Sequence, residues 1–247
     1  MTKQLMIYEN AVPISAEAHR NLAVRQGTDF RFAAALNSVP LVVAEFEKAA
    51  AEYPIVFAGE GPALTPAAVV GLRTDENLCV TAAGAWDGDY VPAFLRRYPF
   101  VFANADAEGN FALCIDTAFE GVNEAGKGER LFDSDGNRTQ YLSNMLQFTS
   151  DYQAQHALTR AFTDRLRELD LLEPATATAS LPDGSRISLG GFLRVSTDRL
   201  ANLDDAAVLD LFRTGFLGVI HAHVASMSRL PGLLARAERR AAEAKAA

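Results

Sequence analysis

One long amphipathic run between about Thr139 and Leu171 constrains the fold of this chain more than any other segment. Side chains recur there at the three–four spacing of one helix face: Tyr141, Met145, Phe148, Tyr152, Thr159, Phe162, Leu166 and Leu169. This pattern predicts a single long helix with one buried face. After Tyr152 the next inward position offers only Gln155 or His156, and Thr159 follows, so the middle of the buried face is polar. These groups either satisfy one another in a core or line a pocket around Tyr152, Gln155 and Thr159.

Short apolar runs separated by turn residues predict antiparallel strands around that helix. The predicted pairs are 68–73 with 78–82, 100–103 with 111–116, and the two arms of 175–195 around Pro182–Asp183–Gly184. Further predicted elements are a strand at 55–58, short helices at 41–52 and 91–97, a surface loop at 120–130, and a C-terminal helix at 205–229. We therefore expect an α+β fold, an antiparallel sheet with the long central helix and the C-terminal helix packed on it. Residues 1–237 are expected to form one domain, and residues 238–247 a frayed polar helical tail.

Charge and composition argue against several classes of protein. The formal net charge of −8 disfavours non-specific binding to nucleic acid or to an anionic membrane. The most apolar region, residues 206–230, contains Asp210, Arg213 and two histidines, which argues against a membrane span. The N-terminus lacks the apolar run and cleavage site of a signal peptide. These observations predict a soluble, cytoplasmic protein.

Cysteine usage fits the same prediction. Cys79 and Cys114 both lie in apolar, strand-like runs, which indicates two buried thiols. The alternative is a disulfide between neighbouring strands, which needs an oxidising compartment. Neither cysteine belongs to a CxxC pair, and the turn around Gly136 has the wrong spacing for a calcium loop, so no metal site is predicted.

Residues 86–102, with the sequence WDGDYVPAFLRRYPFVF, combine large aromatics with two adjacent arginines. Aromatic side chains and arginine are typical of recognition surfaces. Arg96 and Arg97 point about 100° apart on a helix, so one can face the protein while the other faces solvent. One alternative is a structural tie to a buried carboxylate such as Asp116. The other is an anion-binding arginine in a patch made of Trp86, Tyr90, Arg96, Arg97 and Tyr98. We expect one arginine of each kind.

The same segment resembles the central motif of the bacterial SapC family. The resemblance continues, in the family's order, through FALCID, LFDSDGNRTQYL, RELDLLEP, LPDGSRISLGGFLRVS and GFLGVIHAHVASMSRL, and it covers about residues 40–230. It implies an association with a bacterial surface layer, and it implies no established catalytic residues. The membrane-spanning transporter permease of the same name is a different protein.

The histidines give the one candidate for catalysis. His221 and His223 are two residues apart and diverge on a helix, so they cannot hold one metal together. His223 lies on an apolar face, where a hydrogen-bonded core histidine is the ordinary interpretation, yet it is also the best candidate for an acid–base role. It belongs to the AHVAS segment that resembles the family. Phosphate loops, nucleophile elbows and zinc-protease motifs are missing from the sequence.

These observations favour a non-enzymatic binding or accessory protein. It would recognise a peptide, glycan or anionic ligand through the aromatic–arginine patch, without a cofactor. The alternative is an enzyme of unrecognised type that uses His223 as acid or base in a polar pocket. The partner would be a peptide, a glycan or another protein, and assembly into a homo-oligomer stays open.

Overall fold

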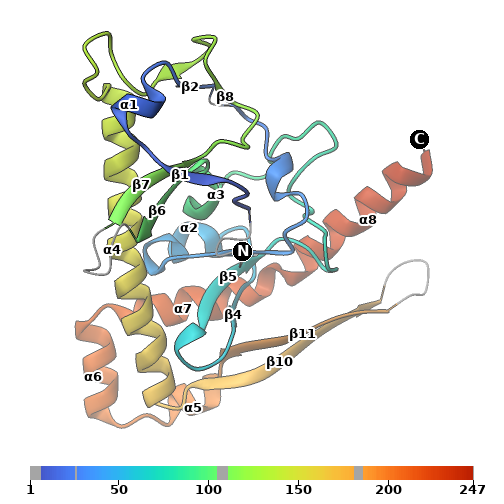
Figure 1. Cartoon of the computed structure of the whole chain (residues 1–247). Coiled ribbons are helices and arrows are strands. Elements are labelled where there is room, and N and C mark those ends of the chain that lie inside the picture. The colour runs from blue at the N-terminus through green and yellow to red at the C-terminus, as the bar shows by residue number, and fades with distance from the viewer. Residues whose placement is uncertain (1–6, 26, 105–110, 181–185, 247) are drawn as a thin grey trace. The chain divides into compact units, whose positions relative to one another are not determined.

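The computed structural model of the chain describes residues 7–25, 27–104, 111–180 and 186–246 (Figure 1). Its internal contacts divide the chain into two compact units. The first unit comprises Met1–Asp29 and Leu95–Ala154, and the second comprises Phe30–Phe94 and Gln155–Ala247. The predicted long helix is confirmed as α4 (Gln140–Glu168), which gives its first half to one unit and its second half to the other. Whether residues 1–237 form one domain, as the sequence predicts, is not tested by this division, and the single domain stays a prediction.

The first unit is built on a three-stranded antiparallel sheet in the order β1-β7-β6. Its elements are β1 (Ala11–Pro13), α1 (Ala16–His19), β2 (Ala23–Val24), β6 (Phe100–Asn104), β7 (Phe111–Asp116), β8 (Val122–Asn123) and β9 (Glu129–Arg130). The predicted pairing of 100–103 with 111–116 is confirmed, with Phe100 opposite Ile115. Phe100 of β6, Ile115 of β7 and Leu142 of α4 belong to a buried apolar core. The turn expected between the two strands lies outside the described residues.

The loop expected at 120–130 contains two short strands instead. β8 and β9 both pair with β2. The side chain of Asn123 closes the turn between them, since it accepts from the backbone N–H of Lys127 and donates to the Lys127 carbonyl. Glycine and charge indicated a surface loop there, but not the two strands, because their partner β2 comes from a distant part of the sequence.

The second unit is built on a five-stranded antiparallel sheet in the order β10-β11-β4-β5-β3. Its strands are β3 (Ser38–Pro40), β4 (Ile55–Ala58), β5 (Thr65–Val69), β10 (Leu172–Ser180) and β11 (Arg186–Val195). The α+β class with antiparallel sheets is therefore confirmed. The predicted 175–195 hairpin is present as β10 and β11, and its Pro182–Asp183–Gly184 turn lies outside the described residues.

The predicted pairing of 68–73 with 78–82 is wrong. β5 pairs with β3 and β4, and residues 78–82 form turns with one isolated bridge from Val80 to Trp86. The side chain of Asn77 holds this segment, because it accepts from the N–H of Cys79 and donates to the carbonyl of Ala33. An apolar run can thus be buried without joining a sheet ladder.

The predicted helix at 205–229 is broken near its middle. The helices of the second unit are η1 (Arg31–Ala33), η2 (Val43–Glu45), α2 (Phe46–Ala50), η3 (Gly61–Ala63), α5 (Thr197–Ala201), α6 (Asp205–Arg213), α7 (Phe216–Ser226), η4 (Met227–Arg229) and α8 (Leu230–Ala246). Gly215 separates α6 from α7 with a φ of 78°, a left-handed conformation that glycine adopts without steric cost. The short α3 (Ala93–Arg96) lies where the first unit's second segment begins.

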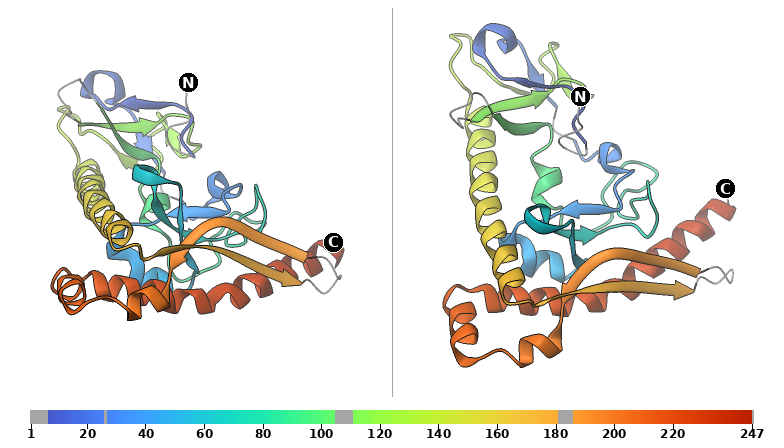
Figure 2. Two further views of the ribbon diagram at one scale, coloured as in Figure 1. Left: turned by 90° about the horizontal axis from the view of Figure 1, so that it is seen from below. Right: turned by 60° about the horizontal axis from the view of Figure 1, so that its bottom comes forward.

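Helix α8 packs along the β10–β11 hairpin (Figure 2). Leu233 and Ala237 of the helix lie in one buried cluster with Phe192 of β11 and Val56 of β4. Past these residues, the Arg240 side chain donates to the carbonyls of Asn77 and Val80. No single described helix is long and apolar enough to cross a membrane; α6 and residues 216–243 meet that criterion only as a pair bent by 91°.

Candidate functional site

Arg97 follows α3 in the first unit and is buried, with 6% of its surface exposed. Its guanidinium lies 4.6 Å from the ring centroid of Tyr152 and 5.8 Å from that of Tyr8. A guanidinium over aromatic faces is attracted by the ring quadrupole, and the attraction grows when water is excluded. The side chain therefore ties the N-terminal segment to α4.

Arg96 lies one residue earlier and is exposed. Its guanidinium lies 5.3 Å from the ring centroid of Phe148, a half-buried residue of α4. The two adjacent arginines therefore occupy different environments, as helix geometry predicted. The structure assigns burial to Arg97 and exposure to Arg96.

Tyr98 lies beside the buried carboxylate of Asp116. This carboxylate is fully buried, and it accepts hydrogen bonds from the backbone N–H groups of Glu9 and Asn10, at 2.8 and 2.9 Å. It also accepts from the N–H of Ala118 and from the Tyr98 hydroxyl, at 3.1 and 3.3 Å. Burial and the nearby Asp116 charge raise the pKa of Tyr98 above its usual value. Three of these four hydrogen bonds to the buried carboxylate thus come from backbone amides, and the predicted arginine tie stays a prediction.

Trp86 and Tyr90 belong to the second unit, where their polar atoms hold the chain in place. The Trp86 indole Nε1–H donates to the Tyr53 hydroxyl at 3.0 Å and to the Tyr90 carbonyl at 3.2 Å. The Tyr90 hydroxyl donates to Glu45 Oε1 at 2.7 Å. These contacts use the polar ends that a recognition surface would present.

Glu45 and Glu52 are two carboxylates beside Tyr90 that the sequence did not single out. Glu45 is 4% exposed and accepts from the N–H groups of Val42 and Ala93 as well as from Tyr90. Glu52 accepts from the Asp89 and Tyr90 N–H groups. The sequence did contain a signal for Glu45, because it lies three residues after Val42. At this spacing a glutamate side chain can accept a hydrogen bond from the backbone N–H at the start of a helix.

The polar positions of α4 fall in both units. Tyr152 belongs to the Arg97 contacts of the first unit, whereas Gln155 and Thr159 lie in the second. The buried Thr159 hydroxyl oxygen accepts from the N–H of Val43 at 3.0 Å and donates to the Gln155 carbonyl at 2.7 Å. Thr159 therefore has a satisfied structural role, the first of the two alternatives left open by the sequence.

His223 is fully buried on α7. Its Nε2 accepts from the N–H of Val195 at 3.0 Å, and its ring lies 4.9 Å from that of Phe57. Burial lowers the pKa of His223 to about 4, so the imidazole is neutral at physiological pH. The same helix turn is tied to β4, since Ser226 Oγ accepts from the Ile55 N–H at 2.9 Å. This geometry gives His223 a structural contact between a helix and a sheet.

Among the described residues, no group of three or more histidines, cysteines, aspartates or glutamates is placed to hold a metal ion. Cys79 and Cys114 are both buried and free, as predicted for reduced thiols.

Comparison with known proteins identifies the family. The sequence model of the SapC family matches residues 14–233 of this 247-residue chain. The chain belongs to the SapC family. Neither a curated protein nor a solved structure matches it. The SapC match includes every residue predicted for a site, whereas Tyr8, which contacts Arg97, lies outside the matched range.

Proposed function

We propose that this SapC protein is a non-enzymatic binding or accessory protein that recognises an anionic group on a peptide or glycan. The observation that carries the proposal is the position of Arg96, exposed on α3 with its guanidinium over the ring of Phe148. A planar cation supported by an aromatic face presents paired N–H donors to a carboxylate or phosphate. Arg97, by contrast, is buried between two tyrosines and serves the fold.

Binding is favoured over acid–base catalysis by the geometry of His223. Its Nε2 already accepts a backbone hydrogen bond, and the whole side chain is buried. A general acid or base must reach the proton that it transfers. In this site the nitrogen lone pair faces the strand β11 and not a substrate.

The proposal is tested by calorimetric titration with two anionic probes, hexaglutamate peptide and trigalacturonate. The variants are Arg96→Ala and a matched control, Arg130→Ala, which removes the same charge from another exposed arginine of the first unit. We expect at least one probe to bind the wild-type protein. Its affinity should fall about tenfold or more in Arg96→Ala, a loss of about 1.4 kcal/mol, and stay unchanged in Arg130→Ala.

Arg97→Ala separates binding from folding. Loss of its two aromatic contacts should destabilise the protein by about 2 kcal/mol or more, whereas Arg96→Ala should change stability by less than about 0.5 kcal/mol. Thermal melts measure both. If neither probe binds the wild type, or if Arg96→Ala binds as tightly as the wild type, the proposed recognition role of Arg96 is wrong.

A further inference from the structure

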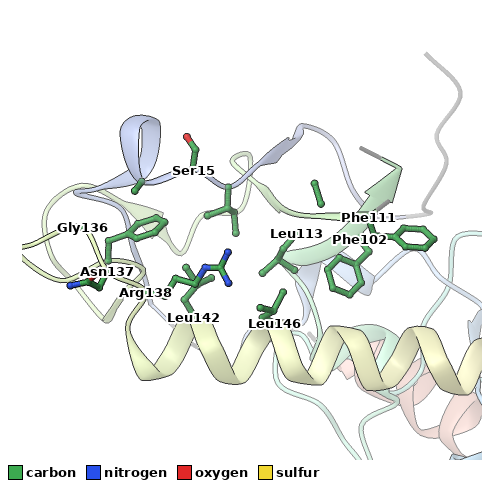
Figure 3. Close-up of a pocket in the computed structure, with 13 residues that line it drawn as sticks. Ser15, Phe102, Phe111, Leu113, Gly136, Asn137, Arg138, Leu142 and Leu146 are labelled. Atoms are coloured by element: carbon green, nitrogen blue, oxygen red, sulfur yellow. The ribbon is translucent and has the colours of Figure 1, made fainter. Parts of the chain in front are cut away.

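The first unit contains a cavity of about 650 Å³, separate from Arg96 (Figure 3). It lies between β6, β7, the turn before α4 and the first turns of α4 itself, with the Ile14–Ala16 segment on another side. Its volume falls within the range of about 300–1,000 Å³ that is usual for small-molecule sites. All its lining residues belong to the first unit.

The lining of this cavity combines apolar and polar residues. Phe102 and Phe111 lie at one end, and Arg138 and Asn137 lie at the opposite end (Figure 3). Leu113 of β7 and Leu146 of α4 lie between the two ends, and Leu142 lies beside Arg138 (Figure 3). A ligand that matches this lining needs an apolar body with a polar group at one end.

Arg138 supplies a positive charge at this end of the cavity. Within the described part of the chain, its guanidinium makes no hydrogen bond and no ion pair, and the residue is exposed. The nearby carboxylate of Asp133 is turned into its own loop, where it accepts from the N–H groups of Asp135 and Asn137 at 2.9 and 2.8 Å. These hydrogen bonds to Asp133 order the loop that carries Arg138. Asp135 of the same loop is exposed.

Phe111 supplies an apolar surface at the other end that is only partly covered. Its side chain is 49% exposed, and its ring centroid lies 6.1 Å from that of Phe102. Covering such a surface with an aliphatic group is favourable by about 25 cal/mol per Å² of apolar area removed from water. An exposed aromatic beside a cavity is thus a favourable contact for an apolar tail.

We propose that this cavity binds an aliphatic monocarboxylate, with its carboxylate on Arg138 and its hydrocarbon chain along the leucines toward Phe102 and Phe111. Arginine pairs well with a carboxylate because its planar fork offers two parallel N–H donors. The apolar wall selects a hydrocarbon chain over a sugar or a polar peptide, whose hydroxyl and amide groups would be buried without partners. This site is independent of Arg96 and of the function proposed above.

The test uses decanoate below its micelle-forming concentration and decanol as the uncharged analogue, both followed by calorimetry. Arg138→Gln removes the charge at the cavity, and Arg130→Gln is the matched control at an exposed arginine outside the cavity lining. We expect decanoate to bind the wild type and to lose about tenfold or more in affinity in Arg138→Gln. Decanol binding should be the same in wild type and Arg138→Gln, and Arg130→Gln should change neither.

Leu146→Trp tests the apolar part, because this half-buried side chain lines the cavity and a larger ring would fill it. Both ligands should bind the Trp variant more weakly, and a thermal melt verifies that it is folded.

Equal decanoate affinity in wild type and Arg138→Gln, or no binding to the wild type, overturns the proposal. Binding to phosphatidylglycerol vesicles without binding to decanoate also overturns it and indicates a membrane surface. Arg96→Ala should bind decanoate normally, which separates this site from the proposed recognition role.

Discussion

At the scale of single residues, His223 shows how burial fixes a protonation state. One ring nitrogen accepts the Val195 N–H, and the side chain has no exposed surface on which a charge could be hydrated. Protonation would remove the lone pair that accepts this hydrogen bond and would place a charge in an apolar region. The folded protein therefore binds a proton at His223 less readily than the unfolded chain does.

This difference predicts a pH dependence of stability. The pKa of His223 is about 4 in the folded protein, against about 6.5 in the unfolded chain. Between these values the unfolded state binds more protons, so the free energy of unfolding rises with pH. The contribution is fully present above pH 6.5 and is lost as the pH falls through 4; over the whole window it is about 3 kcal/mol.

Urea unfolding of wild type and His223→Gln across pH 4 to 7.5 measures this contribution. The stability of the variant should depend less steeply on pH than that of the wild type within this window. His221→Gln, on the exposed side of the same helix, is the matched control and should follow the wild type. Parallel curves for wild type and His223→Gln would contradict the interpretation of His223 as a buried neutral imidazole.

At the scale of elements, α4 is joined to η2 through Thr159. The Val43 N–H belongs to the first turn of η2, where helix geometry leaves it without an intrahelical acceptor. The Thr159 hydroxyl provides that acceptor across 116 residues of sequence. The polar position in the middle of the long helix is thus a cap for another helix.

Thr159→Val should destabilise the protein, because it leaves a buried backbone donor without a partner. The expected cost is about 1–3 kcal/mol in the free energy of unfolding, measured in urea. Thr163→Val is the matched control, since the Thr163 hydroxyl donates only to the Arg160 carbonyl of its own helix among the described contacts. Equal losses in the two variants would mean that the bond from Val43 contributes nothing to stability.

At the scale of the whole molecule, stability depends on packing and not on a covalent cross-link. Cys79 and Cys114 are free and buried, one in each unit. Burial raises the pKa of Cys79 to about 12 and also raises that of Cys114 above its usual value. Both sulfurs are therefore protonated and unreactive in the folded state at neutral pH.

Two measurements follow for the intact protein. Ellman's reagent should titrate two thiols in denaturant and should react much more slowly with the folded protein. The melting temperature should be the same with and without dithiothreitol. A clear fall of the melting temperature on reduction would show that a disulfide contributes to stability.

Local patterns predicted those elements whose partners are close in sequence. The 100–116 strand pair and α4 were predicted well, because alternation and three–four spacing report directly on a strand or a helix. Residues 78–82 were predicted wrongly, because an apolar run shows that a segment is buried but not which partner it meets. The break between α6 and α7 had a local signal in Gly215, which the apolar pattern on both sides outweighed.

The sequence by itself determined the SapC family, the α+β class, the long helix and the divergence of Arg96 from Arg97, since each depends on residue order and backbone geometry alone. Only the tertiary structure decided that Arg97 is the buried arginine, because Tyr8 and Tyr152 come from distant segments. It likewise decided that Thr159 and His223 accept hydrogen bonds from backbone N–H groups and that Arg138 lines a cavity. Hydrogen-bond partners and cavities arise where distant segments contact each other, and the residue pattern of one segment does not indicate which distant segment it contacts.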